Sequence, residues 1–72
     1  MNAPHQMDHE EILRARLEIL RREHRDLDLA IEALQEAPAP DPFTLKRLKK
    51  KKLALRDLIA RIEDMLTPDI IA

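Results

Sequence analysis

The sequence predicts an all-α protein, an antiparallel two-helix hairpin with coiled-coil packing. Apolar residues recur at alternating intervals of three and four in two stretches, the spacing of a helix seam that packs against another helix. A short proline-rich segment separates the two stretches. The 72 residues contain no glycine and one aromatic residue, Phe43, and a chain rich in Leu, Ala, Glu, Lys and Arg favours helix over sheet.

The first helix is expected at about residues 8–36. Asp8, followed three residues later by Glu11, has the pattern of a capping box at a helix start. The apolar positions of its seam are Leu13, Leu17, Leu20, Leu27, Ile31 and Leu34. His24 occupies the seam position at which a Leu or Ile would normally stand, so one layer of the helix contact is polar.

The second helix is expected at about residues 42–66. Prolines at alternate positions cannot continue a helix, so the segment 37–41 is predicted to be the loop. Asp41 is a natural N-cap, and Pro42 fits the first helical position. The apolar seam residues are Leu45, Leu48, Leu55, Ile59, Ile62 and Leu66, and Lys52 is the polar exception. Residues 1–7 and 67–72 are expected to be tails.

The short loop folds the helices back on each other and sets their register. With Leu34 near Leu45, the two polar exceptions, His24 and Lys52, fall in adjacent layers. Asp28 lies one helical turn after His24. We therefore expect His24, Asp28 and Lys52 to form one polar cluster within the seam.

The hairpin is expected to self-associate into a four-helix bundle or a longer coiled coil. A small chain without cysteine has no disulfide to support its limited core, so a homo-oligomer is the predicted partner arrangement. Further apolar residues flank the seam at the end away from the loop and form a predicted oligomer face. They are Ile12, Ile19, Leu58 and Met65.

The composition predicts where the protein resides and which kinds of partner it can have. Charged residues make up 38% of the chain, the formal net charge is −1, and no stretch approaches a membrane span. Residues 1–36 hold nine acids and five arginines, whereas residues 37–72 hold five acids and eight bases, which suits two helices lying against each other. The absence of cysteine and of a secretory signal pattern indicates a cytoplasmic protein without membrane contact.

Two interpretations fit the pair His24 and Asp28. A carboxylate one turn from an imidazole could tune a general acid or base, or a pH-responsive contact. The same pair could instead be a polar pin that fixes the register of the seam. The chain has no serine, cysteine or tyrosine, and a two-helix hairpin offers no deep pocket, so the structural interpretation is favoured. No enzyme activity, cofactor or small-molecule substrate is expected.

A basic run on the second helix is a candidate polyanion face. Its residues are Lys46, Arg47, Lys49, Lys50, Lys51 and Arg56. Cationic helix faces bind nucleic acids by releasing counterions, although this run lacks aromatic residues for base stacking. The alternative is a solvated face that acids of the first helix, Asp28, Glu32 and Glu36, partly neutralise.

His5 and His9 have the i, i+4 spacing of two metal ligands on one helix face. Pro4 and the position of this pair at the start of the chain favour a polar tail instead, so no metal site is predicted.

Two motifs carry a resemblance to a known family. The first helix reads Leu20-x3-His24-x2-Leu27-Asp28-x2-Ile31, and the second reads Leu48-Lys49-Lys50-x-Lys52-Leu53-x-Leu55-Arg56-Asp57-x-Ile59. Together, over about residues 13–62, they resemble the YdcH-like family of short bacterial proteins. The resemblance implies a helical hairpin of unknown function.

By the family pattern, the signature polar positions are His24, Asp28, Lys49, Lys52 and Asp57. The chain departs from the pattern at Arg56, where the family more often has Lys, and at Leu58, where it often has an acid. The resemblance supplies no reaction. The sequence thus favours a non-enzymatic interaction or structural module that binds itself or an unidentified protein, with nucleic-acid association as the alternative.

Overall fold

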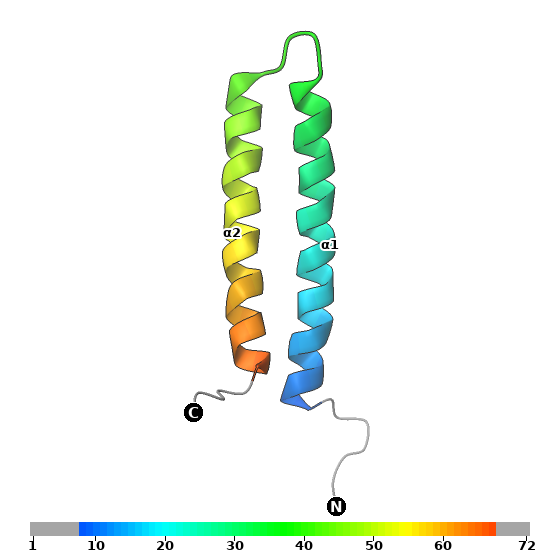
Figure 1. The fold of residues 1–72 in the computed structure, drawn as a ribbon, viewed down its shortest axis with the longest axis vertical. Coiled ribbons are helices and arrows are strands. Elements are labelled where there is room, and N and C mark those ends of the chain that lie inside the picture. Colours follow the sequence, from blue (N-terminus) through cyan, green and yellow to red (C-terminus); the bar gives the residue numbers. More distant parts are fainter. Residues whose placement is uncertain (1–7, 68–72) are drawn as a thin grey trace, which may run out of the picture.

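The protein folds as two antiparallel α-helices that lie side by side (Figure 1). The structure, a computed structural model, describes residues 8–67. The first helix, α1, spans His9–Gln35, and the second, α2, spans Pro42–Leu66. The predicted hairpin is confirmed. The tails expected at 1–7 and 67–72 lie outside the described residues, apart from Thr67, the C-cap of α2.

α1 begins one residue later and ends one residue earlier than the expected range of 8–36. Asp8 has an extended backbone, with φ −74° and ψ 162°, and its side chain accepts a hydrogen bond from the Glu10 N–H at 2.7 Å. The Glu11 carboxylate accepts in turn from the Asp8 N–H at 3.3 Å. Asp8 is therefore the N-cap of α1, and Glu36 is its C-cap.

Asp41 starts α2 after the proline-rich loop. One oxygen of its carboxylate accepts from the Phe43 N–H at 3.1 Å, and the other accepts from the Thr44 hydroxyl at 2.7 Å. The Thr44 hydroxyl and the Phe43 N–H hold the pKa of Asp41 below its ordinary value, because both hydrogen bonds favour the charged form. Pro42 occupies the first turn, where no partner for its backbone nitrogen is needed.

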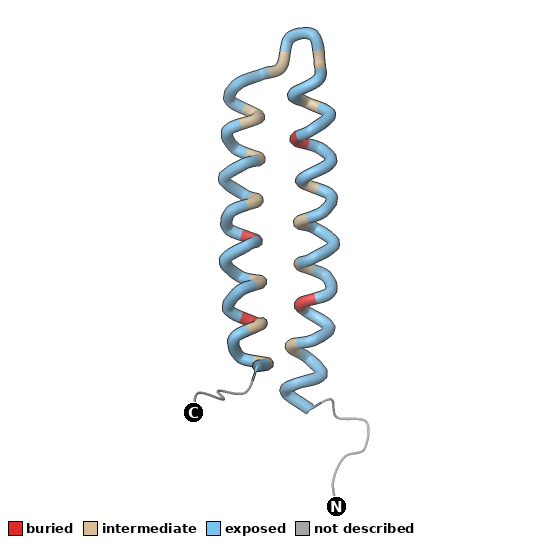
Figure 2. Tube along the Cα trace, viewed as in Figure 1, coloured by how far each residue is buried: buried red, intermediate tan, exposed pale blue. Residues whose placement is uncertain are grey.

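The core is a thin line of side chains between the two helices. Four residues among those described are buried, with exposed fractions of 5–7%: Leu17, Ile31, Leu55 and Ile62 (Figure 2). The other apolar seam positions are half-buried, namely Leu13, Leu20, Leu27, Leu34, Leu45, Leu48, Ile59 and Leu66. No side chain within residues 8–67 is completely buried. A two-helix layer thus leaves both of its broad sides uncovered.

Neither α1 nor α2 has the length and apolar content that a membrane-crossing helix needs.

Candidate functional site

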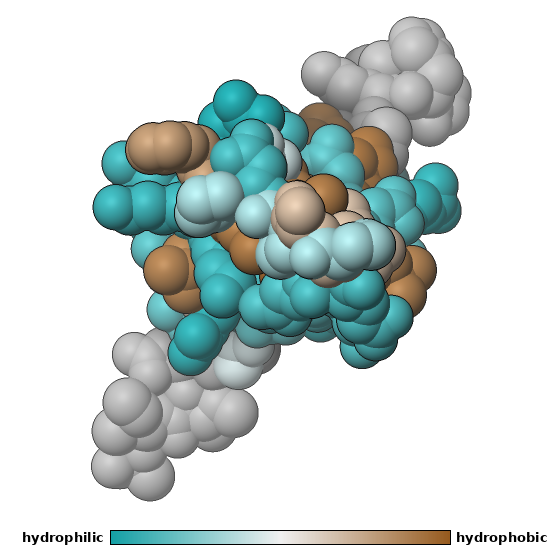
Figure 3. All heavy atoms as spheres, turned by 90° about the horizontal axis from the view of Figure 1, so that it is seen from above, coloured by the Kyte–Doolittle hydropathy of each residue, from teal (hydrophilic) through white to brown (hydrophobic). Residues whose placement is uncertain are grey.

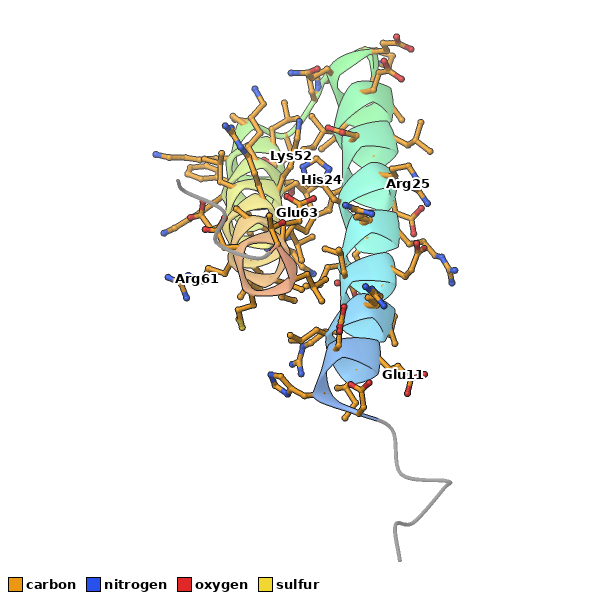
Figure 4. All side chains as sticks on the ribbon, turned by 60° about the horizontal axis from the view of Figure 1, so that its bottom comes forward. Glu11, His24, Arg25, Lys52, Arg61 and Glu63 are labelled. Atoms are coloured by element: carbon orange, nitrogen blue, oxygen red, sulfur yellow. The ribbon has the colours of Figure 1, made fainter. Side chains whose placement is uncertain are left out.

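A polar layer of His24, Asp28 and Lys52 interrupts the apolar seam. The Lys52 ammonium forms an ion pair with one carboxylate oxygen of Asp28. The His24 Nδ1 lies 3.7 Å from the other oxygen, within ion-pair range when the ring is protonated. His24 and Lys52 both lie between the helices, whereas Arg25 and Arg61 extend away from them (Figure 4). The structure therefore brings together the three residues that the sequence placed in one cluster.

Lys52 dominates the electrostatics of the layer. Its hydrogen bond to Asp28, together with its positive charge and that of His24, holds the pKa of the Asp28 carboxyl below the ordinary value. The side chains of His24 and Lys52 are 25% and 36% exposed, so water reaches the edge of the layer. Neither charge is therefore buried without a partner. This arrangement suits a polar pin between two helices.

The layer holds an imidazole, a carboxylate and an ammonium, but no hydroxyl or thiol. The sequence contains no serine, cysteine or tyrosine. Its two threonines lie elsewhere: Thr44 donates to the N-cap Asp41, and Thr67 ends α2.

The polar layer opens onto one broad side of the hairpin, which we call the ion-paired side. There the guanidinium of Arg21 donates to the Glu63 carboxylate at 2.7 Å, and Asp28 contacts Lys52. Both pairs bridge α1 and α2. Toward the loop, the same side carries an open groove of about 700 Å³. It is lined by Asp28, Leu29, Ile31, Glu32, Gln35, Lys49, Lys52, Leu53 and Arg56.

The Arg21–Glu63 bridge and the groove were not anticipated from the sequence. The signal for the bridge was present: Arg21 directly follows the seam residue Leu20, and Glu63 directly follows Ile62. Such flanking positions of two antiparallel helices meet along one side of the seam, where opposite charges attract. The groove depends on how far Lys49 and Arg56 extend from α2, which helical periodicity does not specify.

The opposite side carries the apolar flank, defined as Ile12, Ile19, Leu58 and Met65. These residues directly precede the seam residues Leu13, Leu20, Ile59 and Leu66, respectively. At 3.6 residues per turn, residues before and after a seam position lie on opposite shoulders of a helix. The flank therefore lies across the hairpin from the Arg21–Glu63 bridge. Its side chains are 43–60% exposed.

The basic face of α2 is defined as Lys46, Arg47, Lys49, Lys50, Lys51 and Arg56. All six residues are exposed. Among residues 8–67, the ion pairs join Arg14 to Glu10, Arg21 to Glu63, and Asp28 to both His24 and Lys52. None of these pairs includes a residue of the basic face, so Glu32 and Glu36 do not neutralise it by direct contact.

No group of three or more His, Asp or Glu side chains within residues 8–67 is arranged to hold a metal ion. His9 is the first residue of α1, and His5 lies outside the described residues, so the spacing of these two histidines is not placed in space.

A family model with the description "Protein of unknown function (DUF465)" matches residues 17–63. The chain belongs to this family. It is a family of small helical proteins, and the match confirms the resemblance to YdcH-like proteins. No curated protein and no solved structure matches the chain.

The matched range covers some candidate residues and omits others. It contains the whole polar layer, together with Lys49 and Asp57 of the signature positions. Asp57 is exposed on α2. Ile19 and Leu58 of the apolar flank fall inside the range, whereas Ile12 and Met65 fall outside it. The flank therefore extends beyond the segment that the family model describes.

Proposed function

We propose that the chain is a non-enzymatic, cytoplasmic interaction module that self-associates through the apolar flank. The carrying observation is the exposure of four large apolar side chains on one side of a hairpin that has only four buried residues within its described part. Single exposed apolar residues are ordinary on protein surfaces, but a group on one side marks an interaction site. Burying the flank would widen the core from a line into a layer.

A largely polar surface at the loop end favours self-association that stops at a closed assembly. Viewed from the loop end, the surface is mostly hydrophilic, and hydrophobic patches interrupt it (Figure 3). A small domain without disulfides gains stability from oligomerisation, because association buries apolar surface that one chain cannot cover alone. The polar layer of His24, Asp28 and Lys52 would restrict which helix alignments the assembly can adopt.

Sedimentation of paired variants tests this proposal. At tens of micromolar, the natural chain should sediment as a dimer or larger species, and Ile19→Glu or Leu58→Glu should sediment as a monomer, because each places a charge in the interface. Leu29→Glu and Leu53→Glu are matched controls: these leucines are 64% and 55% exposed but line the groove on the ion-paired side.

The controls should keep the oligomer intact. A natural chain that remains monomeric would refute self-association. An oligomer that dissociates in the Leu29 or Leu53 variants, but not in the Ile19 or Leu58 variants, would place the interface on the ion-paired side instead.

A second candidate function is association with nucleic acid or another polyanion through the basic face. The observation that favours it is the lack of direct ion pairs from α1 to the basic face within residues 8–67. Exposed lysine and arginine side chains without an ion-pair partner can bind phosphates, and the counterions of the phosphates are released. Aromatic stacking does not contribute, because Phe43 is the sole aromatic residue of the chain.

A salt series in a gel-shift assay with duplex DNA and with RNA tests the second candidate. Binding at low salt that weakens steeply as salt rises is the expected result. Replacing Lys49 and Lys50 with glutamine should weaken binding, while the matched change of Arg22 and Arg25 on α1 should have less effect. Absence of binding at low salt would eliminate this function.

A further inference from the structure

On the side of the hairpin that carries the apolar flank, the charged residues of α1 and α2 differ: α1 contributes acidic residues and one arginine, and α2 contributes basic residues alone. Its residues are those that directly precede a seam position. On α1 the charged members are Arg16, Glu23 and Asp26, and on α2 they are Arg47, Lys51 and Arg61. The α2 set contains no acid. None of these six residues belongs to an ion pair among residues 8–67.

Two closed arrangements can place this side of the hairpin against the same side of a second copy. A two-fold axis across the helices sets α1 against α1 and α2 against α2. A two-fold axis parallel to the helices sets α1 of each copy against α2 of the other. The first arrangement opposes the all-basic set of α2 with its own copy, and such like-charge contacts are unfavourable. The second arrangement opposes the all-basic set of α2 with the α1 set, in which Glu23 and Asp26 are acidic and Arg16 is basic.

We propose that a second copy of this chain covers the apolar flank about a two-fold axis parallel to the helices, with both loops at the same end. This inference rests on the proposed self-association and specifies its geometry. A rotation about that axis keeps every residue at its own height along the hairpin. The heights of α1 and α2 residues within one chain therefore decide which side chains meet between the copies.

The heights agree with this arrangement in the half of the hairpin that lies away from the loop. Leu13, Met65 and Leu66 line one hollow at the end of the hairpin, which sets Ile12 at the level of Met65. Counting six residues along each helix from Leu13 and Leu66 sets Ile19 level with Ala60, about 3 Å along the axis from Leu58. Apolar flank residues of one copy would then meet apolar flank residues of the other.

The heights also agree in the half near the loop. Asp28 contacts Lys52, so Asp26 is level with Ala54, about 4.5 Å along the axis from Lys51. That is within reach of the long Lys51 side chain of the second copy. Arg16 and Arg61 are the like-charged residues that fall near each other. Their long aliphatic stems can lie over the flank while the guanidinium groups stay in water, and Arg61 already extends away from α1 (Figure 4).

The whole side of the hairpin, when covered, has the area of a standard protein interface. One side of the hairpin is roughly 40 Å long for a 27-residue helix and about 20 Å wide for two helices. The resulting area of about 800 Å² per copy equals that of a standard protein interface.

Cysteine cross-linking tests the arrangement directly, because the natural chain has no cysteine. Ile19→Cys and Leu58→Cys are prepared separately, checked for helicity by circular dichroism, mixed in equal amounts and oxidised. Cys is a small hydrophobe, and both positions are exposed in the hairpin, so the fold should persist. We expect disulfides between one variant and the other to exceed self-linked dimers of either variant, as mass spectrometry would show.

Self-linked Ile19→Cys dimers in excess of mixed dimers would overturn the arrangement, since they require α1 to face α1. This outcome is distinct from failure of the proposed function, in which the natural chain sediments as a monomer and no cross-link exceeds the level of random collision.

Charge reversal gives a second, independent measurement. Lys51→Asp should weaken dimerisation about tenfold, and Asp26→Lys should act similarly, because each opposes like charges across the interface. The combined variant should recover most of the affinity. Lys50→Asp carries the same charge change at the neighbouring exposed position outside this side and should leave the dimer nearly unchanged. Equal weakening by Lys50→Asp, or no recovery in the combined variant, would overturn the pairing.

Discussion

The apolar and polar layers of one seam serve different purposes. Leu17 and Ile62 in the apolar part are 7% and 5% exposed, whereas the side chains of His24 and Lys52 are 25% and 36% exposed. Burial of aliphatic side chains stabilises without regard to direction. The ion pair from Lys52 to Asp28 forms in one alignment of the helices. The apolar layers thus supply the free energy of folding, and we propose that the polar layer selects the alignment.

The largest effect is expected from shortening an apolar layer. Ile62→Ala should lower the free energy of unfolding by about 3 kcal/mol, because it removes buried methyl groups and leaves a cavity between the helices. For a hairpin with so thin a core this approaches complete unfolding, visible as loss of the helical circular dichroism signal. Leu53→Ala on the same helix is the control, since Leu53 is 55% exposed. A similar loss from both substitutions would contradict a core confined to the seam.

A smaller effect of opposite sign is expected in the polar layer. His24→Leu should raise the free energy of unfolding by about 1 kcal/mol, because an apolar side chain replaces a polar one between the helices. The gain should come with weaker selection of one assembly, seen as additional oligomeric states by native mass spectrometry at fixed protein concentration. Marked destabilisation would instead mean that His24 makes hydrogen bonds that the fold requires.

The sequence predicted the hairpin because its two signals are local and strong. Apolar periodicity gave the seam, and Asp8, Asp41 and the alternating prolines gave the ends. The polar layer was also predictable, because register follows once a short loop joins two antiparallel helices. The Arg21–Glu63 bridge and the groove were not predicted, since both depend on side-chain conformations that periodicity leaves open.

The bridge beside the seam should matter less than the seam itself. Arg21→Gln should lower the free energy of unfolding by about 0.5 kcal/mol, because the Arg21 and Glu63 side chains are nearly half exposed and water competes for both charges. Urea unfolding at low and high salt measures the change, which should shrink as salt screens the pair. Arg22→Gln, on the same helix without an ion-pair partner among residues 8–67, is the control. An undiminished effect at high salt would indicate packing by the Arg21 stem instead of charge.

The smallest effect is expected from titration of the polar layer. The hydrogen bond and charge of Lys52 lower the pKa of Asp28 in the folded chain below its unfolded value of 3.8. A carboxyl group with a lowered folded pKa stabilises above the unfolded pKa, and this contribution is lost as pH falls through the folded pKa. Other carboxylates titrate in the same range, so the informative quantity is the difference between the natural chain and Asp28→Asn.

That difference, measured by urea unfolding from about pH 7 to about pH 3, should favour the natural chain at neutral pH and vanish at the acid end. Repeating the comparison in a Lys52→Gln background separates the contribution of Lys52 to the low pKa of Asp28 from that of His24. Because Lys52 is the main reason for the low pKa, the pH dependence should largely disappear when its ammonium is gone. A pH dependence that persists there would assign the low pKa of Asp28 to His24 more than to the lysine.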